Sequence, residues 1–289
     1  MFREGHPTGE FTKKELLKTI EKPEVTAADI RTDAPEIDGT KFILQRHERY
    51  QLSGDHVGSL TEASAQKAHD QSTRILKEML EPLSEEERRN VAFLVVGSNT
   101  KHHGKGMRSM ETAGKVLEAT KNELTRLDLG ADQIINNRSG SKGVAPIAKM
   151  QAPRLFDDSP TYTEFLIEKY GAVTQQFWKA FEEDTHKEER IAFGAEGPDE
   201  MDQRFSKYLS TLSKYAETFH RENPGKRLVI WAVSHYDTVS PYIKRHITKT
   251  DPHQYLAVDY GAGVSVDIGA DGKATSVFQG EEYDVDLAA

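Results

Sequence analysis

The chain has 289 residues, of which 36% are hydrophobic and 29% are charged, and this composition predicts a soluble globular protein with a large core. Its formal net charge of −9 argues against a general nucleic-acid-binding protein, and the absence of cysteine excludes disulfides, thiolate catalysis and cysteine-ligated metals. The chain has no apolar run that could span a membrane and no apolar secretory signal at its N-terminus, so we expect a cytoplasmic protein.

The first elements follow an N-terminal extension, which we place at residues 1–40, before one domain at 41–289. A Thr-x-x-Glu capping box at 12–15 predicts a short helix within the extension. The apolar run KFILQ then predicts a buried strand. Apolar residues at helical spacing over 61–81 predict an amphipathic helix, and Ser-Glu-Glu-Glu at 84–87 is a second capping box.

The middle of the chain begins with VAFLVVGS at 91–98, which predicts a second buried strand, and the helical period returns over 110–127. Residues 131–200 are polar and irregular apart from one predicted helix over about 161–183. Because functional loops lie on rigid scaffolds, we interpret this stretch as an inserted lid that covers a site. The charge run HKEER at 186–190 predicts a solvent-exposed helix face.

The last third predicts a long amphipathic helix over 200–223 and a third buried strand, RLVIWAVSH, at 227–235. Alternating apolar and polar residues around Asp271-Gly272 predict a β-hairpin over 263–279. This order of elements predicts an α/β fold. We expect a three-layer sandwich with a mainly parallel central sheet, helices on both faces, the inserted lid region and a C-terminal β-hairpin.

Polar side chains follow all three buried strands: Arg46 and His47 the first, Ser98 and then Arg108 the second, Ser234 and His235 the third. Because ligands bind outside the carboxyl ends of the strands in open α/β sheets, we expect these side chains to converge. A neutral imidazole can attack phosphorus, and guanidinium groups bind phosphoryl oxygens bidentately. Two histidines and two arginines at one crevice therefore predict phosphoryl transfer through a phosphohistidine.

Simpler explanations exist for several of these features. A single strand can end in an Arg-His pair without any function, and only the order of three polar strand ends weighs against that explanation. The loop HHGKG at 102–106 does not have the spacing of a phosphate-binding P-loop. His102 and His103 lack a placed carboxylate, so we interpret them as surface residues and not as metal ligands.

Three stretches carry a resemblance to a known family: LQRHE with GSLTEASAQKA at 44–68, RSMETA at 108–113, and VIWAVSHYDTV at 229–239. They are similar, in this order, to the Arg-His-Gly motif and the helix start after it, to Arg-Ala-x-x-Thr-Ala, and to the strand with Ser-His-Gly-Gly. These are motifs of the histidine phosphatase superfamily, and the chain resembles its phosphoglycerate mutase-like branch. The resemblance covers about residues 41–289.

The resemblance implies a role for four side chains. His47 would be the catalytic residue that accepts the phosphoryl group, and Arg46 and Arg108 would bind that group. His235 would be the second catalytic histidine and would donate to the same oxygens. No metal or other cofactor is implied, because the arginines neutralise the charge that Mg²⁺ neutralises in kinases.

The proton donor of the family lies in its variable middle region, about twenty residues before an aromatic helix. Counting back from Trp178 in the stretch FWKAF gives Asp158 as the catalytic acid, with Asp157 as the alternative. Capping of the helix after Pro160 explains the two aspartates equally well.

Two positions depart from the family pattern, since Glu48 and Tyr236 stand where it has glycine. Glycine lets the backbone approach phosphate closely. A carboxylate beside phosphate costs repulsion unless it turns away or pairs, and Arg49 is a candidate partner for Glu48.

The leading hypothesis is a phosphatase that hydrolyses a phosphomonoester, in a small molecule or a protein, through a phosphohistidine on His47. One alternative is a phosphoglycerate mutase-type phosphotransferase, although ERYQLSGDHVG at 48–58 lacks the expected polar signature. Another is a non-catalytic phosphate- or phosphoprotein-binding member of the same fold, in which Glu48 and Tyr236 block the phosphate site. No nucleic-acid or membrane partner is implied, and the substrate and oligomeric state stay open.

Overall fold

A seven-stranded sheet forms the centre of the computed structural model, which describes residues 24–51, 54–101, 106–135, 140, 143–147, 160–171 and 174–287. The strand order is β3-β2-β4-β1-β5-β6-β7. The strands are β1 (Thr40–Arg46), β2 (Val91–Ser98), β3 (Ala145–Ile147), β4 (Arg227–Ser234), β5 (Gly263–Ile268), β6 (Ala274–Phe278) and β7 (Glu281–Asp284). β3, β2, β4 and β1 are parallel, and β5 to β7 extend the sheet in antiparallel pairs. The predicted hairpin is the β5–β6 pair.

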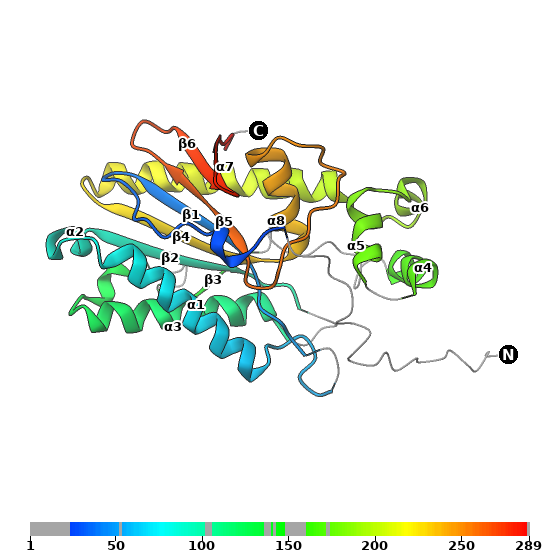
Figure 1. The fold of residues 1–289 in the computed structure, drawn as a ribbon, viewed down its shortest axis with the longest axis horizontal. Coiled ribbons are helices and arrows are strands. Elements are labelled where there is room, and N and C mark those ends of the chain that lie inside the picture. The colour runs from blue at the N-terminus through cyan, green and yellow to red at the C-terminus, as the bar shows by residue number, and fades with distance from the viewer. Residues whose placement is uncertain are drawn as a thin grey trace.

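Helices cover both faces of the sheet, as Figure 1 shows. α1 (Glu62–Leu80) and α3 (Arg108–Arg126) lie on one face, and α7 (Pro198–Glu222) and α8 (Tyr236–Tyr242) lie on the other. The shorter helices are α2 (Glu85–Arg89), α4 (Pro160–Tyr170), α5 (Gln175–Glu182) and α6 (Lys187–Ala192), with single turns at Ala27–Asp29, Ala131–Gln133 and Ile243–Ile247. The predicted α/β three-layer sandwich is confirmed. Among the described helices, none is both long and apolar enough to cross a membrane.

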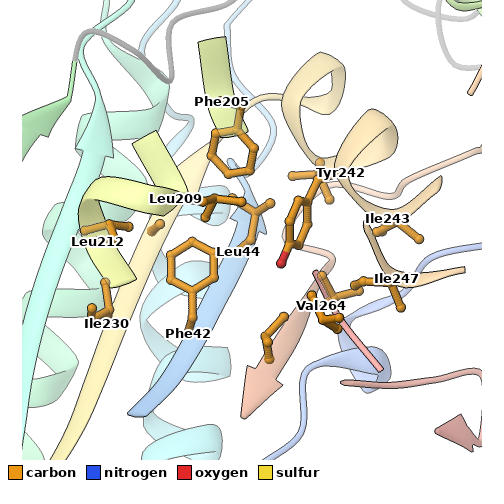
Figure 2. Close-up of a cluster of buried hydrophobic side chains, with 14 of the residues drawn as sticks. Phe42, Leu44, Phe205, Leu209, Leu212, Ile230, Tyr242, Ile243, Ile247 and Val264 are labelled. Carbon is orange, nitrogen blue, oxygen red and sulfur yellow. The ribbon is translucent and has the colours of Figure 1, made fainter. Parts of the chain in front are cut away.

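The central strands divide their side chains between two cores, because successive side chains point to opposite faces. Phe42 and Leu44 of β1 pack against α7 and α8, as Figure 2 shows, whereas Ile43 faces α1 and α3. In β4, Ile230 packs in the core on the α7 and α8 side, and Trp231 packs in the core on the α1 and α3 side. Burial on both faces explains why these strands are nearly continuous apolar runs.

The parallel strands end at one edge of the sheet. In the pairing of β1 with β4, Arg46 lies opposite Ser234, and the backbone N–H of His47 donates to the carbonyl of Ser234 at 2.9 Å. β2 lies on the other side of β4, where Gly97 is opposite Val233. The residues that follow β1, β2 and β4 are therefore neighbours in space.

The predicted single helix over 161–183 is wrong, because the structure has two helices, α4 and α5. Gly171 ends α4 with a φ of +81°, a backbone conformation that glycine adopts without strain. α4, α5 and the segment after α6 share a small core of their own, made of Tyr162, Leu166, Phe177, Phe181 and Ala195. This unit lies at one end of the molecule, beyond α8 (Figure 1).

Three local predictions concern two capping boxes and the charge run HKEER. The capping box at Ser84 is confirmed, since its hydroxyl accepts from the backbone N–H of Glu87 and the Glu87 carboxylate accepts from Ser84. The solvent-exposed face predicted for HKEER is wrong at Arg190, which is only 2% exposed and donates to Asp184 at 2.7 Å. The capping box predicted at 12–15 lies outside the described residues.

The described part of the N-terminal segment packs on the sheet. Val25 is buried in the core on the α7 side and forms a parallel bridge with Val258. Ile30 is buried in the core on the α1 and α3 side, and the backbone N–H of Arg31 donates to the Ser265 hydroxyl. Residues 24–39 therefore contribute to both cores.

The buried position of Ile43 leads to a stability prediction. Its side chain is fully buried in the central strand β1, so Ile43→Ala should lower the free energy of unfolding by about 2–5 kcal/mol. Ile191 is 59% exposed, and Ile191→Ala should change it by less than about 0.5 kcal/mol. Urea denaturation followed by circular dichroism measures both changes, and similar losses in the two variants would contradict this packing.

Candidate active site

His47 lies at the carboxyl end of β1, and its buried ring is held at both nitrogens. Nδ1 lies 2.7 Å from the backbone carbonyl of Glu48, and Nε2 lies 2.8 Å from Nε of Arg108. A carbonyl only accepts and a guanidinium only donates, so the proton is on Nδ1 and Nε2 carries a lone pair. Burial and the nearby charges, with Arg108 first, hold the pKa of His47 well below its usual value. The ring is therefore neutral near pH 7.

His235 follows β4 and lies against His47, with ring centroids 5.1 Å apart in an edge-to-face arrangement. Its Nε2 lies 3.0 Å from the hydroxyl of Ser98 and 3.2 Å from the hydroxyl of Ser109. Ser98 ends β2, and Ser109 is in the first turn of α3. Four elements, β1, β2, β4 and α3, thus bring the two histidines together.

Two guanidinium groups lie on aromatic rings beside the histidines. Arg108 lies over Tyr50, with its Cζ 4.5 Å from the ring centroid. Arg46 lies over Tyr260 at 3.8 Å and donates through Nη1 to the carbonyl of Val258. Nη1 of Arg108 and Nε of Arg46 are buried without a hydrogen-bond partner among the described residues. Buried donors of this kind need an explanation, and an anion between the two arginines would supply one.

The structure therefore brings His47, Arg108 and His235 into direct contact. Arg46 is close enough for its charge to lower the pKa of His47. The remaining predicted residues, Asp157 and Asp158, lie outside the described part of the chain, as do His102 and His103.

Glu48 pairs with a lysine, so the prediction that Arg49 is its partner is wrong. The buried Glu48 carboxylate pairs with Lys67 of α1, whose Nζ lies 2.9 Å from Oε1, whereas Arg49 lies over the ring of Tyr260. Gly261 makes room for this carboxylate, since a Cβ there would be 2.1 Å from Oε1 of Glu48. The negative charge is thus neutralised on the side of α1.

Tyr236, the second residue in place of glycine, joins the site to the inserted helices. Its ring centroid lies 5.5 Å from that of Trp178 in α5, and the guanidinium of Arg46 lies 5.4 Å from the Tyr236 ring. Burial, with the Glu182 carboxylate of α5, raises the pKa of the Tyr236 hydroxyl well above its usual value. The aromatic side chain therefore forms a neutral wall between Arg46 and α5.

Asp237 is a carboxyl group that the sequence analysis missed. It is buried in the first turn of α8, and its Oδ1 has no hydrogen-bond partner within the described residues. Burial raises its pKa to about 7, although Arg108, Arg204 and Arg46 each act to lower it. The only signal in the sequence is an aspartate two positions after a strand-end histidine, and its burial cannot be seen there.

The described residues offer no metal site, because nowhere among them do three or more histidine, aspartate or glutamate side chains come together with suitable geometry. The charged groups around His47 are instead donors of hydrogen bonds, the guanidinium groups of Arg46 and Arg108. Such a set suits an anion.

Comparisons with known proteins give fold-level similarity only. No family model and no curated protein matches the chain. Solved structures similar to it include mycobacterial hydrolase 2, with 12% identity over 82% of this chain and 83% of that chain and a TM-score of 0.46. Mycobacterial hydrolase 1 has 13% identity over 82% and 92%, and YhfR of Bacillus stearothermophilus has 14% over 86% and 100%, both with a TM-score of 0.44. Activity and substrate therefore have to be argued from the site.

The Glu48–Lys67 pair generates a stability prediction. Lys67→Met leaves a buried carboxylate without its cation and should lower the free energy of unfolding by about 1–3 kcal/mol. Lys67→Met combined with Glu48→Gln should recover part of this loss, because no buried charge is then left unpaired. Lys115 forms a comparable but exposed pair with Glu118, and Lys115→Met should cost less than about 0.5 kcal/mol. Chemical denaturation measures all three variants, and an equal cost for the two lysines would contradict the pairing.

Proposed function

We propose that the protein is a phosphatase that hydrolyses phosphomonoesters through a phosphohistidine on Nε2 of His47. The observation that carries the proposal is the buried contact of Arg108 with the lone pair of His47, beside guanidinium donors that have no partner among the described residues. A neutral imidazole nitrogen next to a source of positive charge is what an attack on a phosphoryl group requires. The motif resemblance to histidine phosphatases supports the same chemistry.

The first step is attack of His47 Nε2 on phosphorus. Nε–H of Arg108 stops donating to Nε2 of His47 and donates to a phosphoryl oxygen instead. This change frees the lone pair of Nε2. The new N–P bond forms as the bond from phosphorus to the ester oxygen breaks, and a carboxylic acid gives its proton to the leaving alcohol. The imidazole then carries a positive charge, which the carbonyl of Glu48 stabilises by accepting from Nδ1–H.

The second step is hydrolysis of the phosphohistidine. The carboxylate left by the first step takes a proton from water, whose oxygen attacks phosphorus as the N–P bond breaks. Inorganic phosphate leaves, and His47 Nε2 regains its lone pair. Arg46, Arg108 and His235 stabilise the negative oxygens in both transition states.

Two carboxyl groups are candidates for the proton donor. Asp158, with Asp157 as its alternative, follows from the resemblance. Asp237 follows from its environment, because a buried acid with a pKa of about 7 still holds a proton near neutral pH and lies close enough to interact with Arg46 and Arg108.

The two alternative functions, a binding-only protein and a mutase, have less support than hydrolysis. A binding-only protein requires Glu48 and Tyr236 to block the phosphate site, whereas the Glu48 carboxylate pairs with Lys67 of α1. A mutase requires transfer to a second phosphate acceptor, and no described contact favours it. Hydrolysis of a phosphorylated small molecule or protein is therefore the function that we propose.

The role of His47 is tested with p-nitrophenyl phosphate. His47→Ala should lower kcat/KM by about 10³-fold or more, because the nucleophile is lost. His69→Ala, in α1 where the ring contacts Asn122 of α3, should leave turnover unchanged and serves as the matched control. Mass spectrometry after an alkaline quench should find phosphate on His47 of the wild type. Absence of turnover with any phosphomonoester would overturn the proposal, and isomerisation of 3-phosphoglycerate with a bisphosphoglycerate primer would identify a mutase.

The proton donor is tested by varying the leaving group. If Asp237 is the acid, Asp237→Asn should lower kcat for an alkyl phosphate by about 10²–10⁴-fold but kcat for p-nitrophenyl phosphate far less, because nitrophenolate leaves without a proton. In the wild type, turnover of the alkyl phosphate should fall as the pH rises through about 7, where Asp237 loses its proton.

The stability of the same variant is the control for misfolding. A carboxyl whose pKa is raised on folding destabilises the native state progressively as the pH rises from its ordinary pKa to the raised one, and the loss is complete above the raised value. Asp237→Asn should therefore be at least as stable as the wild type at pH 8, by thermal denaturation. If Asp158→Asn shows the leaving-group dependence and Asp237→Asn does not, the acid is Asp158.

A further inference from the structure

Ser98 and Ser109 both contact Nε2 of the second histidine. Each hydroxyl is fully buried, and their oxygens lie 3.0 Å and 3.2 Å from this nitrogen of His235. They reach it from two elements, since Ser98 ends β2 and Ser109 directly follows Arg108 at the start of α3. The adjacent residues Arg108 and Ser109 therefore hold one histidine each, His47 and His235.

The partners of the Ser109 hydroxyl decide which group supplies the proton. Its oxygen lies 3.3 Å from the backbone carbonyl of Ser234, and a carbonyl only accepts, so the single hydroxyl proton of Ser109 points there. The lone pairs of the Ser109 oxygen are then left for His235, and the proton between the two must come from Nε2. Ser98 agrees with this assignment, because its hydroxyl also has Thr100 as a neighbour at 3.0 Å and can accept from the histidine.

We propose that Ser109, with Ser98, is a positioning residue that holds His235 with its proton on Nε2, the tautomer opposite to that of His47. His47 has its proton on Nδ1 and its lone pair on Nε2. Neighbouring hydrogen bonds thus give two buried imidazoles, whose centroids are 5.1 Å apart, opposite proton arrangements. The ring of His47 has the lone pair that a nucleophile needs, and the ring of His235 donates its Nε2–H to the serine hydroxyls.

The consequence for catalysis rests on the proposed function. If Nε2–H of His235 is committed to the serines, this residue can donate to a phosphoryl oxygen only through Nδ1, which carries a second proton in the imidazolium form. The serines would then fix the ring in the orientation that presents Nδ1, and the imidazolium would contribute positive charge when a dianion binds. Loss of the serine bonds should weaken binding of the anion, because the ring becomes free to change tautomer and orientation.

The tautomer can be measured without any substrate. Protein labelled with ¹⁵N-histidine gives long-range ¹H–¹⁵N spectra that distinguish Nε2–H from Nδ1–H rings, and His235→Gln identifies the signals of His235. We expect the Nε2–H form in the wild type, a mixture of tautomers in Ser98→Ala/Ser109→Ala, and restoration of the Nε2–H form in Ser109→Thr, which keeps a hydroxyl. Ser72→Ala removes a buried hydroxyl from α1 that donates to the carbonyl of Ala68, and it should leave the His235 signals unchanged.

Two results would overturn the proposal: an Nδ1–H form of His235 in the wild type, or an unchanged tautomer in the double alanine variant. The kinetic arm uses p-nitrophenyl phosphate, for which Ser109→Ala should raise KM by about two- to tenfold, the range for one neutral hydrogen bond, and Ser109→Thr should recover most of this change. A protein with the expected tautomers but no turnover would overturn the proposed function and leave the role of the serines standing. Turnover by a protein whose His235 does not carry its proton on Nε2 would overturn the role of the serines and leave the proposed function standing.

Discussion

The pairing of β1 with β4 determines where the two histidines lie. Arg46 is opposite Ser234, and the backbone N–H of His47 donates to the Ser234 carbonyl at 2.9 Å, so each strand delivers its histidine immediately beyond the last paired residue. A shift of the register by one residue would turn every side chain of β1 to the opposite core, whose packing is shaped for other side chains. Burial on both faces therefore fixes the register, and the register fixes the distance between the imidazoles.

Positive charge is kept in the site by partners that do not neutralise it. Arg46 and Arg108 lie on the rings of Tyr260 and Tyr50, and neither forms an ion pair with a carboxylate in the described part of the chain. A π face or a carbonyl stabilises a guanidinium without cancelling its charge. The carboxyl group that interacts with both, Asp237, has a pKa of about 7 and so is only partly ionised near neutral pH. The arginines thus retain the charge that an anion would meet.

Glu48 and Tyr236, which stand where the resemblance leads us to expect glycine, have space and partners elsewhere in the chain. Space for the Glu48 carboxylate comes from Gly261, whose φ is +74° and which has no side chain to collide with it, and charge neutralisation comes from Lys67. The ring of Tyr236 packs on Trp178 of the insertion. Each large side chain therefore forms a contact that glycine cannot form, and neither lies between His47 and Arg108, which are in direct contact.

The buried strands, the long helices, the closing hairpin and the strand-end positions of His47 and His235 can be predicted from the amino-acid sequence, because hydrophobic period and turn chemistry are local properties. The sequence did not locate the break at Gly171 within the predicted lid helix, since a single glycine is compatible with a helix until packing selects its conformation. The partner of Glu48, the burial of Arg190, the environment of Asp237 and the contact of Ser109 with His235 follow from the folded structure alone. The reason is physical: these properties depend on side chains that folding brings together, such as Ser109 and His235, 126 positions apart, and on the water that folding removes from around them.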